Sequence, residues 1–440
     1  MTVAPYPLTA IVTTDLAGIT RGRFVIADRI EQHMQTGIGW LPANLALTAF
    51  GTIAEANPWG SAGDLRLLPD PAARYRTDAT GAATPFDMVI GDIVELDGTP
   101  WSCCPRTILK AAVAELKAAT GLSLRVAFEQ EFQVFGADFP AAHPLSVGAL
   151  RRADPFAPRL AAALDEAGVE PEVLIAEFGA DQFELTCAPA DPLRAADRAV
   201  AIREIVRETA RVAGWSASFA PKTAPQAVGN GVHIHFSLLD DAGNPVTYDP
   251  AASAGLSARA ASFCAGMLRH LPALLLLSAP SIPSYYRLRP HSWSASWTWL
   301  ADRDREATLR ICPVTTAHGR DPAPQYNIEY RAADATANPY LALAAIIRAG
   351  LAGLTGALPP PAIIAEHPDT LDETRRAALG LYRLPDSLEA AIAAWMADDV
   401  ASSWFAPAFV ETMLCVRRAE MARLADLADA DICHLYRDLY

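Results

Sequence analysis

The chain of 440 residues lacks several features that mark other classes of protein. Basic residues are in the minority, with 36 Lys and Arg against 50 Asp and Glu, and the net charge of −14 argues against nucleic acid or an anionic membrane surface as a partner. The longest apolar run, residues 271–280, is shorter than the roughly 20 residues that span a bilayer. The N-terminal segment has no basic stretch followed by an apolar one, so no secretory signal is expected.

Cysteine is also sparse, and its pattern argues against a disulfide framework. The seven cysteines are scattered, none forms a CxxC pair, and Cys103 and Cys104 are adjacent in the chain. This pattern predicts reduced thiols in a cytoplasmic protein. There is no tandem repeat or low-complexity tract, and a composition of 51% hydrophobic and 20% charged residues excludes a mostly disordered chain.

The N-terminal part of the chain has the pattern of a small mixed α/β unit. Residues 9–27 predict two short strands around a turn, and residues 28–37 predict a short helix. Residues 41–74 are rich in Pro and Gly and predict irregular structure. Residues 86–101 predict a hairpin with an Asp-Gly turn.

A change of pattern near residue 105 predicts a domain boundary. Beyond it, long strands alternate with long, Ala-rich helices. Asp191-Pro192 and Asn338-Pro339 are each typical of a helix N-cap followed by proline in the first turn. We therefore expect two domains, residues 1–105 and 106–440.

Residues 122–135 alternate between apolar and polar side chains, which is typical of a strand with one buried face. The alternation puts Glu129 and Glu131 on the polar face, roughly 7 Å apart along the strand. Two carboxylates this close repel each other. Either a metal ion binds between them or the face is exposed to solvent, and this strand alone leaves both alternatives open.

Four further segments show the same alternation. Residues 231–239 place His233, His235 and Ser237 on one face. The polar faces of the other segments carry Glu177, Gln182 and Glu184; Thr308 and Arg310; and Asn327, Glu329 and Arg331. If the sheet curves, these faces converge on one cleft, where carboxylates with few nitrogen ligands suit Mg²⁺ or Mn²⁺ and arginine suits phosphate. The pattern predicts a metal-dependent phosphoryl-transfer or ligase site.

The segments that carry these residues resemble, in order and over nearly the whole chain, the motifs of the glutamine synthetase family. The matching segments are FEQEF, EFGADQFEL, SFAPK followed by GNGVHIHFSL, RLRPHSW with DREATLRIC, and NIEYRAADATANPYLALA. The resemblance implies an α+β fold, with an N-terminal β-grasp-like domain followed by an antiparallel half-barrel catalytic domain backed by helices. It also implies a ring-shaped homo-oligomer, commonly a dodecamer, with active sites between subunits.

The same resemblance implies a role for each matching residue. One metal ion would be held by Glu131, Glu177 and Glu184. A second, bridging the phosphates of ATP, would be held by Glu129, His233 and Glu329. The ions would be Mg²⁺ or Mn²⁺. The other implied contacts are His235 and Ser237 with the nucleotide, Arg310 with its phosphates, Gly229, Arg287 and Arg331 with glutamate, and Arg287, Arg305 and Arg310 with the phosphoryl group in transfer.

The reaction that the resemblance implies has two chemical steps. The γ-carboxylate of L-glutamate attacks the γ-phosphate of ATP, while metal and arginine neutralise the phosphate charge. An amine then attacks the resulting γ-glutamyl phosphate, releasing phosphate and forming an amide. The protein would be an ADP-forming carbon–nitrogen ligase of amine and nitrogen metabolism.

The sequence departs from the family where ammonia would bind. Trp293 stands where the family has a flap glutamate, and residues 37–47 have no acidic side chain where the family has an aspartate. We therefore predict an organic primary amine as the nucleophile, with its alkyl part against Trp293. Trp297 and Trp299 lie just beyond, and the alternative is that the tryptophans are ordinary core or subunit-interface residues.

Three other functions stay open. The protein could be an authentic glutamine synthetase that uses ammonia. It could take a different acid, because Val228 and Asn327 replace residues expected to contact glutamate and ATP. It could also be a catalytically inactive structural or regulatory relative. The sequence does not specify the amine, and a polyamine, ethanolamine, methylamine, isopropylamine or an aromatic amine would each fit.

Overall fold

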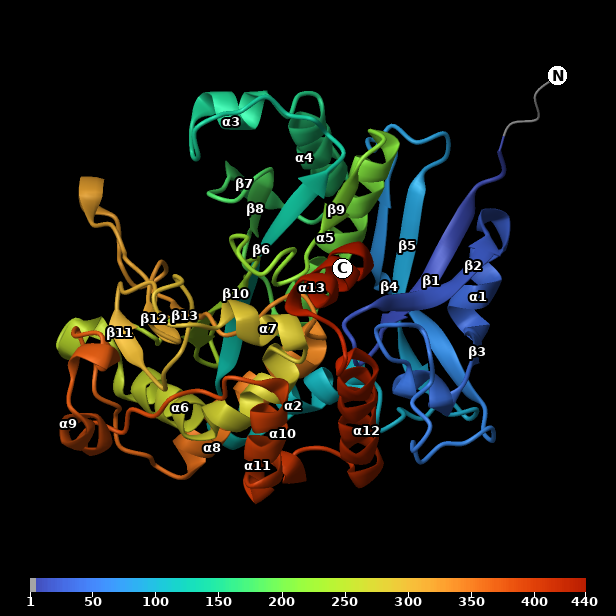
Figure 1. The fold of residues 1–440 in the computed structure, drawn as a ribbon. Helices are drawn as coiled ribbons and strands as arrows, with labels where there is room; N and C mark the ends of the chain where they lie inside the picture. The colour runs from blue at the N-terminus through green and yellow to red at the C-terminus, as the bar shows by residue number, and fades with distance from the viewer. Residues whose placement is uncertain (1–4) are drawn as a thin grey trace.

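The computed structural model describes residues 5–440 and has a mixed α+β fold built on two sheets (Figure 1). The first sheet has the strand order β2-β1-β5-β4-β3; β1 and β5 run parallel, and the other neighbours are antiparallel. Its elements are β1 (Leu8–Thr14), β2 (Thr20–Ile26), α1 (Ile30–Thr36), β3 (Ile38–Trp40), β4 (Leu65–Thr77) and β5 (Phe86–Val94). The strands predicted within residues 9–27 and the helix predicted at 28–37 are confirmed.

One other prediction for this region is wrong in part. The end of segment 41–74, expected to be irregular, belongs to the long strand β4. This strand accommodates Pro69 because its register with β5 shifts just after that residue, and bulges and edges are where sheets tolerate proline. Residues 86–101 do form the predicted hairpin in short form: beyond β5 the chain turns at Asp97-Gly98, Glu95 N donates to the Thr99 carbonyl at 2.8 Å, and Val94 forms an antiparallel bridge with Pro100.

The second sheet contains the strands on which the chemically notable residues were predicted to lie. Its strand order is β11-β12-β13-β10-β6-β8-β7, with β9 beside β6. The strands are β6 (Ser123–Phe135), β7 (Pro171–Ala176), β8 (Gln182–Cys187), β9 (Ser216–Ser218), β10 (Val232–Leu239), β11 (Leu300–Asp302), β12 (Leu309–Ile311) and β13 (Ile328–Tyr330). The sheet is antiparallel, as expected, apart from the parallel pair β11 and β12.

Helices pack against the second sheet and against one another. The helices beyond the first sheet are α2 (Pro105–Thr120), α3 (Val147–Arg151), α4 (Phe156–Glu166), α5 (Pro192–Val212), α6 (Ala258–Ser278), α7 (Ile282–Arg287), α8 (Pro339–Thr355), α9 (Glu373–Ala378), α10 (Leu388–Met396), α11 (Asp399–Ser403), α12 (Pro407–Leu424) and α13 (Asp429–Leu439). Phe236 of β10 packs on Phe263 of α6, with ring centroids 5.4 Å apart. α6 and α8 approach so closely that a Cβ added to Gly266 would lie 2.1 Å from the Ala349 carbonyl oxygen.

Helix α6 is rich in apolar residues. Among the described residues it is the one helix long and apolar enough to cross a membrane, but 78% of its most apolar window is buried inside the protein. It therefore has the surroundings of a core helix. Both predicted N-caps are confirmed: the Asp191 side chain accepts hydrogen bonds at the start of α5, and Asn338 does so at the start of α8.

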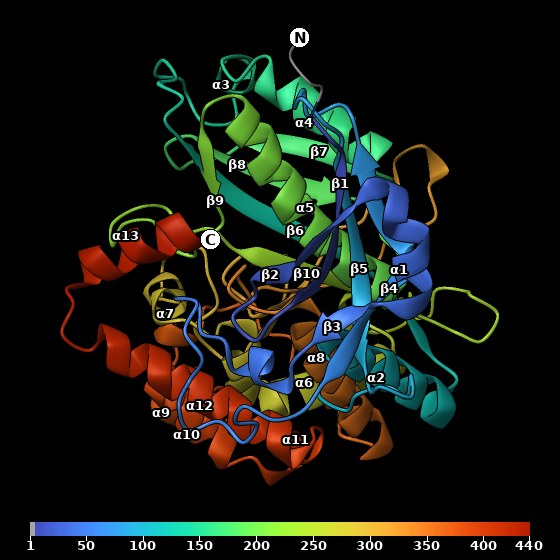
Figure 2. The same ribbon diagram turned by 90° about the vertical axis from the view of Figure 1, so that its right-hand side faces the viewer.

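The C-terminus returns to the body of the same chain. Figure 2 shows α13 beside α7, whose last residue, Arg287, leads into the loop of the candidate site. Tyr440 is buried there; its hydroxyl donates to the Ala17 carbonyl, and its own carbonyl accepts from Phe219 N at 2.8 Å. The chain end thus fastens the first sheet to the segment after β9.

A buried guanidinium joins the two sheets. Arg106 in α2 is 2% exposed and pairs with Asp70 of β4, Asp92 of β5 and Asp197 of α5. Burial disfavours the charged guanidinium, but the carboxylates of Asp197 and Asp92 outweigh burial and raise the Arg106 pKa. One cation therefore neutralises acidic groups from both parts of the chain.

We predict that Arg106→Ala lowers the free energy of unfolding by about 3–5 kcal/mol, because it leaves buried carboxylates without their cation. Lys110→Ala is the matched control, since Lys110 is 38% exposed and pairs with Asp92 alone among the described residues; its loss should stay within about 1 kcal/mol. Urea-induced unfolding of the full chain measures both. Equal losses for the two variants would show that burial of the charge is unimportant.

Candidate active site

The register of the second sheet brings the predicted ligands opposite one another on neighbouring strands. Glu131 of β6 pairs with Glu184 of β8, and Glu129 of β6 pairs with His233 of β10. Facing residues of antiparallel strands lie about 5 Å apart, so their side chains interact. The predicted alternation of β6 and β10 is confirmed, and it turns these side chains toward one cavity.

The cavity has a volume of about 830 Å³. Its lining includes the six predicted metal ligands and most of the predicted substrate contacts, namely Glu129, Glu131, Glu177, Glu184, His233, Glu329, Gly229, Arg287, Trp293, Arg305, Arg310 and Arg331. Two predicted nucleotide contacts lie outside this lining. His235 lies behind Glu129, with 3.5 Å between Nε2 and the carboxylate, and Ser237 lies farther along β10, opposite Arg125. Their contact with a nucleotide stays a prediction.

Two overlapping groups of side chains fit a divalent cation. In each group the donor atoms lie within 4.8 Å of one another; the groups are Glu129, Glu184 and His233, and Glu129, His235 and Glu329. Two carboxylates and one imidazole suit the oxygen-preferring cations Mg²⁺ and Mn²⁺. The grouping differs from the predicted one, because Glu131 and Glu177 line the cavity outside both groups. Which ligand binds which ion stays a prediction.

The crowding of carboxylates sets their charge states. Burial, together with the negative charges of Glu129 and Glu131, raises the pKa of Glu184 to about 9. At Glu129, burial is outweighed by the imidazoles of His233 and His235, which lower its pKa; His233 Nδ1 lies 2.6 Å from the carboxylate. Without a cation the cavity therefore retains a proton on Glu184 at neutral pH.

Glu329 orients two arginines of the cavity. It is 1% exposed; Arg310 Nη1 donates to its Oε2 at 2.7 Å, and Arg331 pairs with its Oε1. Burial disfavours its ionisation, but the charges of His233 and Arg331 outweigh burial and lower the Glu329 pKa to about 2. Glu329 thus stays ionised and orients both guanidinium groups.

Two more arginines reach the cavity. Arg287 is buried, and its Nη2 donates to the Ala333 carbonyl at 2.6 Å. Gly229 leaves room for it, because a Cβ at that position would lie 2.7 Å from Arg287 Cγ. Arg305 also lines the cavity and forms no ion pair within residues 5–440. Its guanidinium is therefore available to an anionic substrate.

The cavity has an apolar rim, which we define as Leu145, Phe178, Val228 and Trp293. All four line the cavity, and all are exposed, with Phe178 at 59% and Trp293 at 66%. The ring centroids of Phe178 and Trp293 are 6.3 Å apart. Large apolar side chains that remain exposed beside a polar cavity are typical of a binding surface.

The Trp293 loop is held by its backbone. Trp293 has a φ of 54°, its N donates to Glu306 Oε1 at 3.2 Å, and Arg331 Nη2 donates to its carbonyl at 3.2 Å. These contacts leave the indole free at the rim. In contrast, Trp297 and Trp299 are buried in a separate apolar cluster, so for these two the alternative of ordinary core residues is confirmed.

The cavity residues that were not predicted from the sequence include Leu145, Phe178 and Lys222. Leu145 and Phe178 lie in loops, where no alternation indicates direction. Lys222, whose Nζ donates to the Ala227 carbonyl at 2.6 Å, is the last residue of the SFAPK segment, so that motif contained the signal.

Comparison with known proteins identifies this arrangement. The glutamine synthetase catalytic domain matches residues 102–435, and the glutamine synthetase N-terminal domain matches residues 2–101. The chain is 36% identical over 435 residues to the gamma-glutamylpolyamine synthetase GlnA3 of Streptomyces coelicolor, covering 97% of this chain and 92% of that protein. It is 29% identical over 391 residues to a glutamine synthetase of Pyrococcus abyssi, covering 87% and 83%.

Solved structures of similar proteins have the same fold as this chain. A crystal structure of a novel glutamine synthase homolog superposes with a TM-score of 0.92 at 43% identity and covers 100% of both chains. GmaS without ligand superposes with a TM-score of 0.79 at 26% identity, covering 96% of this chain and 94% of that one. The chain therefore belongs to the glutamine synthetase family. It is a ligase that forms carbon–nitrogen bonds, in a family that uses ATP and divalent metals.

The raised pKa of Glu184 predicts how metal-free protein responds to pH. Because the folded state keeps a proton that the unfolded chain loses above its ordinary pKa, stability falls as pH rises from 6 toward 9. Each such group changes the free energy of unfolding by at most about 1.4 kcal/mol per pH unit. The pKa of His235 is also raised, so His235 also lowers the stability as pH rises.

Thermal unfolding in EDTA, repeated with Mn²⁺, measures this effect. We expect Mn²⁺ to remove most of the pH dependence, since the cation replaces the proton. Glu184→Gln should flatten the EDTA curve. An unchanged slope in this variant would mean that Glu184 is not the titrating group.

Proposed function

We propose that the protein is an ATP- and divalent-metal-dependent ligase that joins the γ-carboxylate of L-glutamate to an organic primary amine through γ-glutamyl phosphate. The observation that carries the proposal is the apolar rim. Phe178 and Trp293 are exposed at the cavity mouth, where the family resemblance led us to expect a flap carboxylate. The carboxylates and arginines behind the rim suit ATP and a carboxylic acid.

The cation would be Mg²⁺ or Mn²⁺. The ligands that would hold it are Glu129, Glu131, Glu177, Glu184, His233 and Glu329. A bound divalent cation supplies charge neutralisation for transferring phosphate oxygens. The donor atoms of both groups described above already lie close together, which supports this proposal.

Four arginines would provide the remaining positive charge. Arg310 and Arg331, oriented by Glu329, would face the phosphates and the glutamate. Arg287 and Arg305 would stabilise the charge that develops as the phosphoryl group moves to the γ-carboxylate of glutamate. Because Arg287 is buried and held by a backbone carbonyl, it is preorganised for an anion.

The amine must lose a proton before it can attack an acyl phosphate, since an ammonium group has no lone pair. A glutamate of the cavity would accept this proton, and the rim would hold the alkyl part of the amine.

A polyamine is the amine class that we favour. The gamma-glutamylpolyamine synthetase at 36% identity supports this choice. After one amino group of a polyamine enters the cavity, the rest of the molecule lies outside it. That part consists of apolar alkyl segments between cationic ammonium groups. The exposed faces of Phe178 and Trp293 suit such a chain, through alkyl contact and cation–π attraction.

We further propose a cytoplasmic homo-oligomer, a ring-shaped dodecamer, with domains at residues 1–105 and 106–440. The first sheet would be β-grasp-like and the second a half-barrel. The exposure of Phe24 on β2 supports burial by a neighbouring subunit. Light scattering of the purified protein should give a multiple of the 47.0 kDa chain mass. A monomeric mass would contradict shared active sites.

Phosphate release with ATP, Mg²⁺ and L-glutamate tests the substrate preference. We expect putrescine or spermine to exceed ammonia in kcat/KM by at least about tenfold, which corresponds to about 1.4 kcal/mol. Trp293→Glu should shift the preference toward ammonia, because it restores a carboxylate for a small cation. Tyr382→Glu, at another exposed aromatic residue outside the cavity, is the control and should change nothing.

Each contrary result selects an alternative. Faster turnover with ammonia would make the protein an authentic glutamine synthetase. ATP binding without turnover of glutamate would point to a different acid. Failure to bind both metal and ATP in calorimetry would leave an inactive structural or regulatory relative.

A further inference from the structure

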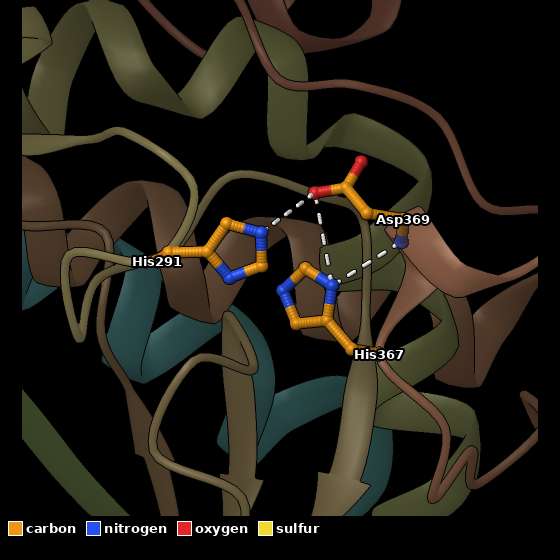
Figure 3. Close-up of side chains that lie close together, drawn as sticks. All are labelled: His291, His367 and Asp369. Carbon is orange, nitrogen blue, oxygen red and sulfur yellow. Dashed lines mark hydrogen bonds and ion pairs between the residues drawn. The ribbon is translucent and has the colours of Figure 1, made fainter.

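A second cluster of metal-binding side chains lies outside the candidate active site. His291 in the loop after α7, His367 and Asp369 place their ligand atoms within 4.8 Å of one another (Figure 3). His291 Nε2 is 3.9 Å and His367 Nδ1 is 3.7 Å from Asp369 Oδ2. These residues come from segments about 75 positions apart in the chain, which the fold brings together.

The cluster also has an outer layer of charged partners. The remaining nitrogens of both rings face Glu306: His367 Nε2 lies 2.9 Å and His291 Nδ1 lies 3.8 Å from Glu306 Oε2. Arg383 pairs with the other oxygen of Asp369. Metal-binding histidines usually direct their second nitrogen at a carboxylate, which fixes ring orientation and raises ligand basicity.

We propose that His291, His367 and Asp369 form a second metal site, selective for Zn²⁺ or a similar transition-metal dication. Two imidazoles and one carboxylate, with a fourth position for water, are a typical zinc set, whereas the carboxylate-rich cavity suits harder cations. Zinc bonds of about 2.0 Å in a tetrahedral site require ligand separations of about 3.3 Å. The distances from the two ring nitrogens to Asp369 Oδ2 are 3.9 and 3.7 Å, so the ligands would have to move inward only slightly.

One existing contact would be replaced. His367 Nδ1 now accepts a 3.2 Å hydrogen bond from its near neighbour, the Asp369 backbone N. A metal ion would take this lone pair. The His291 side chain is 72% exposed, so it has room to swing toward the other two ligands.

The proposed site would fix the Trp293 loop. Glu306, which faces both histidines, uses its other oxygen to accept from Trp293 N at 3.2 Å. His291 and Trp293 both have positive φ, at 56° and 54°, a conformation that persists in non-glycine residues only when surroundings enforce it. Zinc would tie the loop to the segment around His367, and so stabilise the cavity rim. This inference does not depend on the identity of the amine.

Calorimetric titration of the metal-free full-length protein with Zn²⁺, in saturating Mg²⁺, tests the proposal. We expect one Zn²⁺ per chain whose binding is lost in His291→Ala and in the nearly isosteric Asp369→Asn. Glu306→Gln should weaken it by about 10–100-fold. His318→Ala is the matched control, because His318 is exposed and lies outside the cluster, and it should bind as wild type does.

Hydrogen exchange provides the second measurement. Zn²⁺ should slow exchange in residues 290–294 of the wild type and of His318→Ala, and it should have no such effect in His291→Ala. Equal Zn²⁺ stoichiometry and affinity in wild type and His291→Ala would overturn the site, as would the absence of Zn²⁺ binding beyond the cavity. Binding that requires His291 but leaves exchange unchanged would overturn the link to the rim.

Discussion

Repulsion between carboxylates on one face of a sheet is the constraint on which this structure depends. Strands β6 and β8 bring Glu129, Glu131 and Glu184 together, and neighbouring like charges on a sheet are destabilising. Basic groups lie beside them, with His233 on β10, Arg310 on β12 and Arg331 just after β13. Glu329, paired with two guanidinium groups and near His233, is the point where the two sets meet. The cavity holds several carboxylates close together, and this arrangement favours the entry of a cation.

The side of each strand that faces the cavity could be predicted from the sequence, because alternation is a local property of the extended chain. Glu129, Glu131 and His233 were predicted correctly for that reason. Which strands are neighbours is a nonlocal property, so the grouping of ligands around Glu129 required the structure. Strand β4 was missed because Pro69 suggested a break, whereas the register shift beside it absorbs the proline.

Some of the cavity residues that lie in loops could not be predicted from the sequence. Phe178 and Leu145 lie in loops, where alternation does not show which way a side chain points. The cluster of His291, His367 and Asp369 was missed for a related reason, because only tertiary packing brings its two loops together. The three tryptophans of the Trp293 region show the same limit. They lie close in sequence, yet one is exposed at the rim and two are buried.

The position of Arg106 has a consequence for how this chain can be recombined with its relatives. The family domains meet between residues 101 and 102, but the charge balance crosses that border: Arg106 and Asp197 lie after it, and Asp70 and Asp92 lie before it. A fragment ending at the border would keep two acidic groups without their cation. Shuffled chimeras therefore need all four residues to be inherited together, because these ion pairs cross the border between the two family domains.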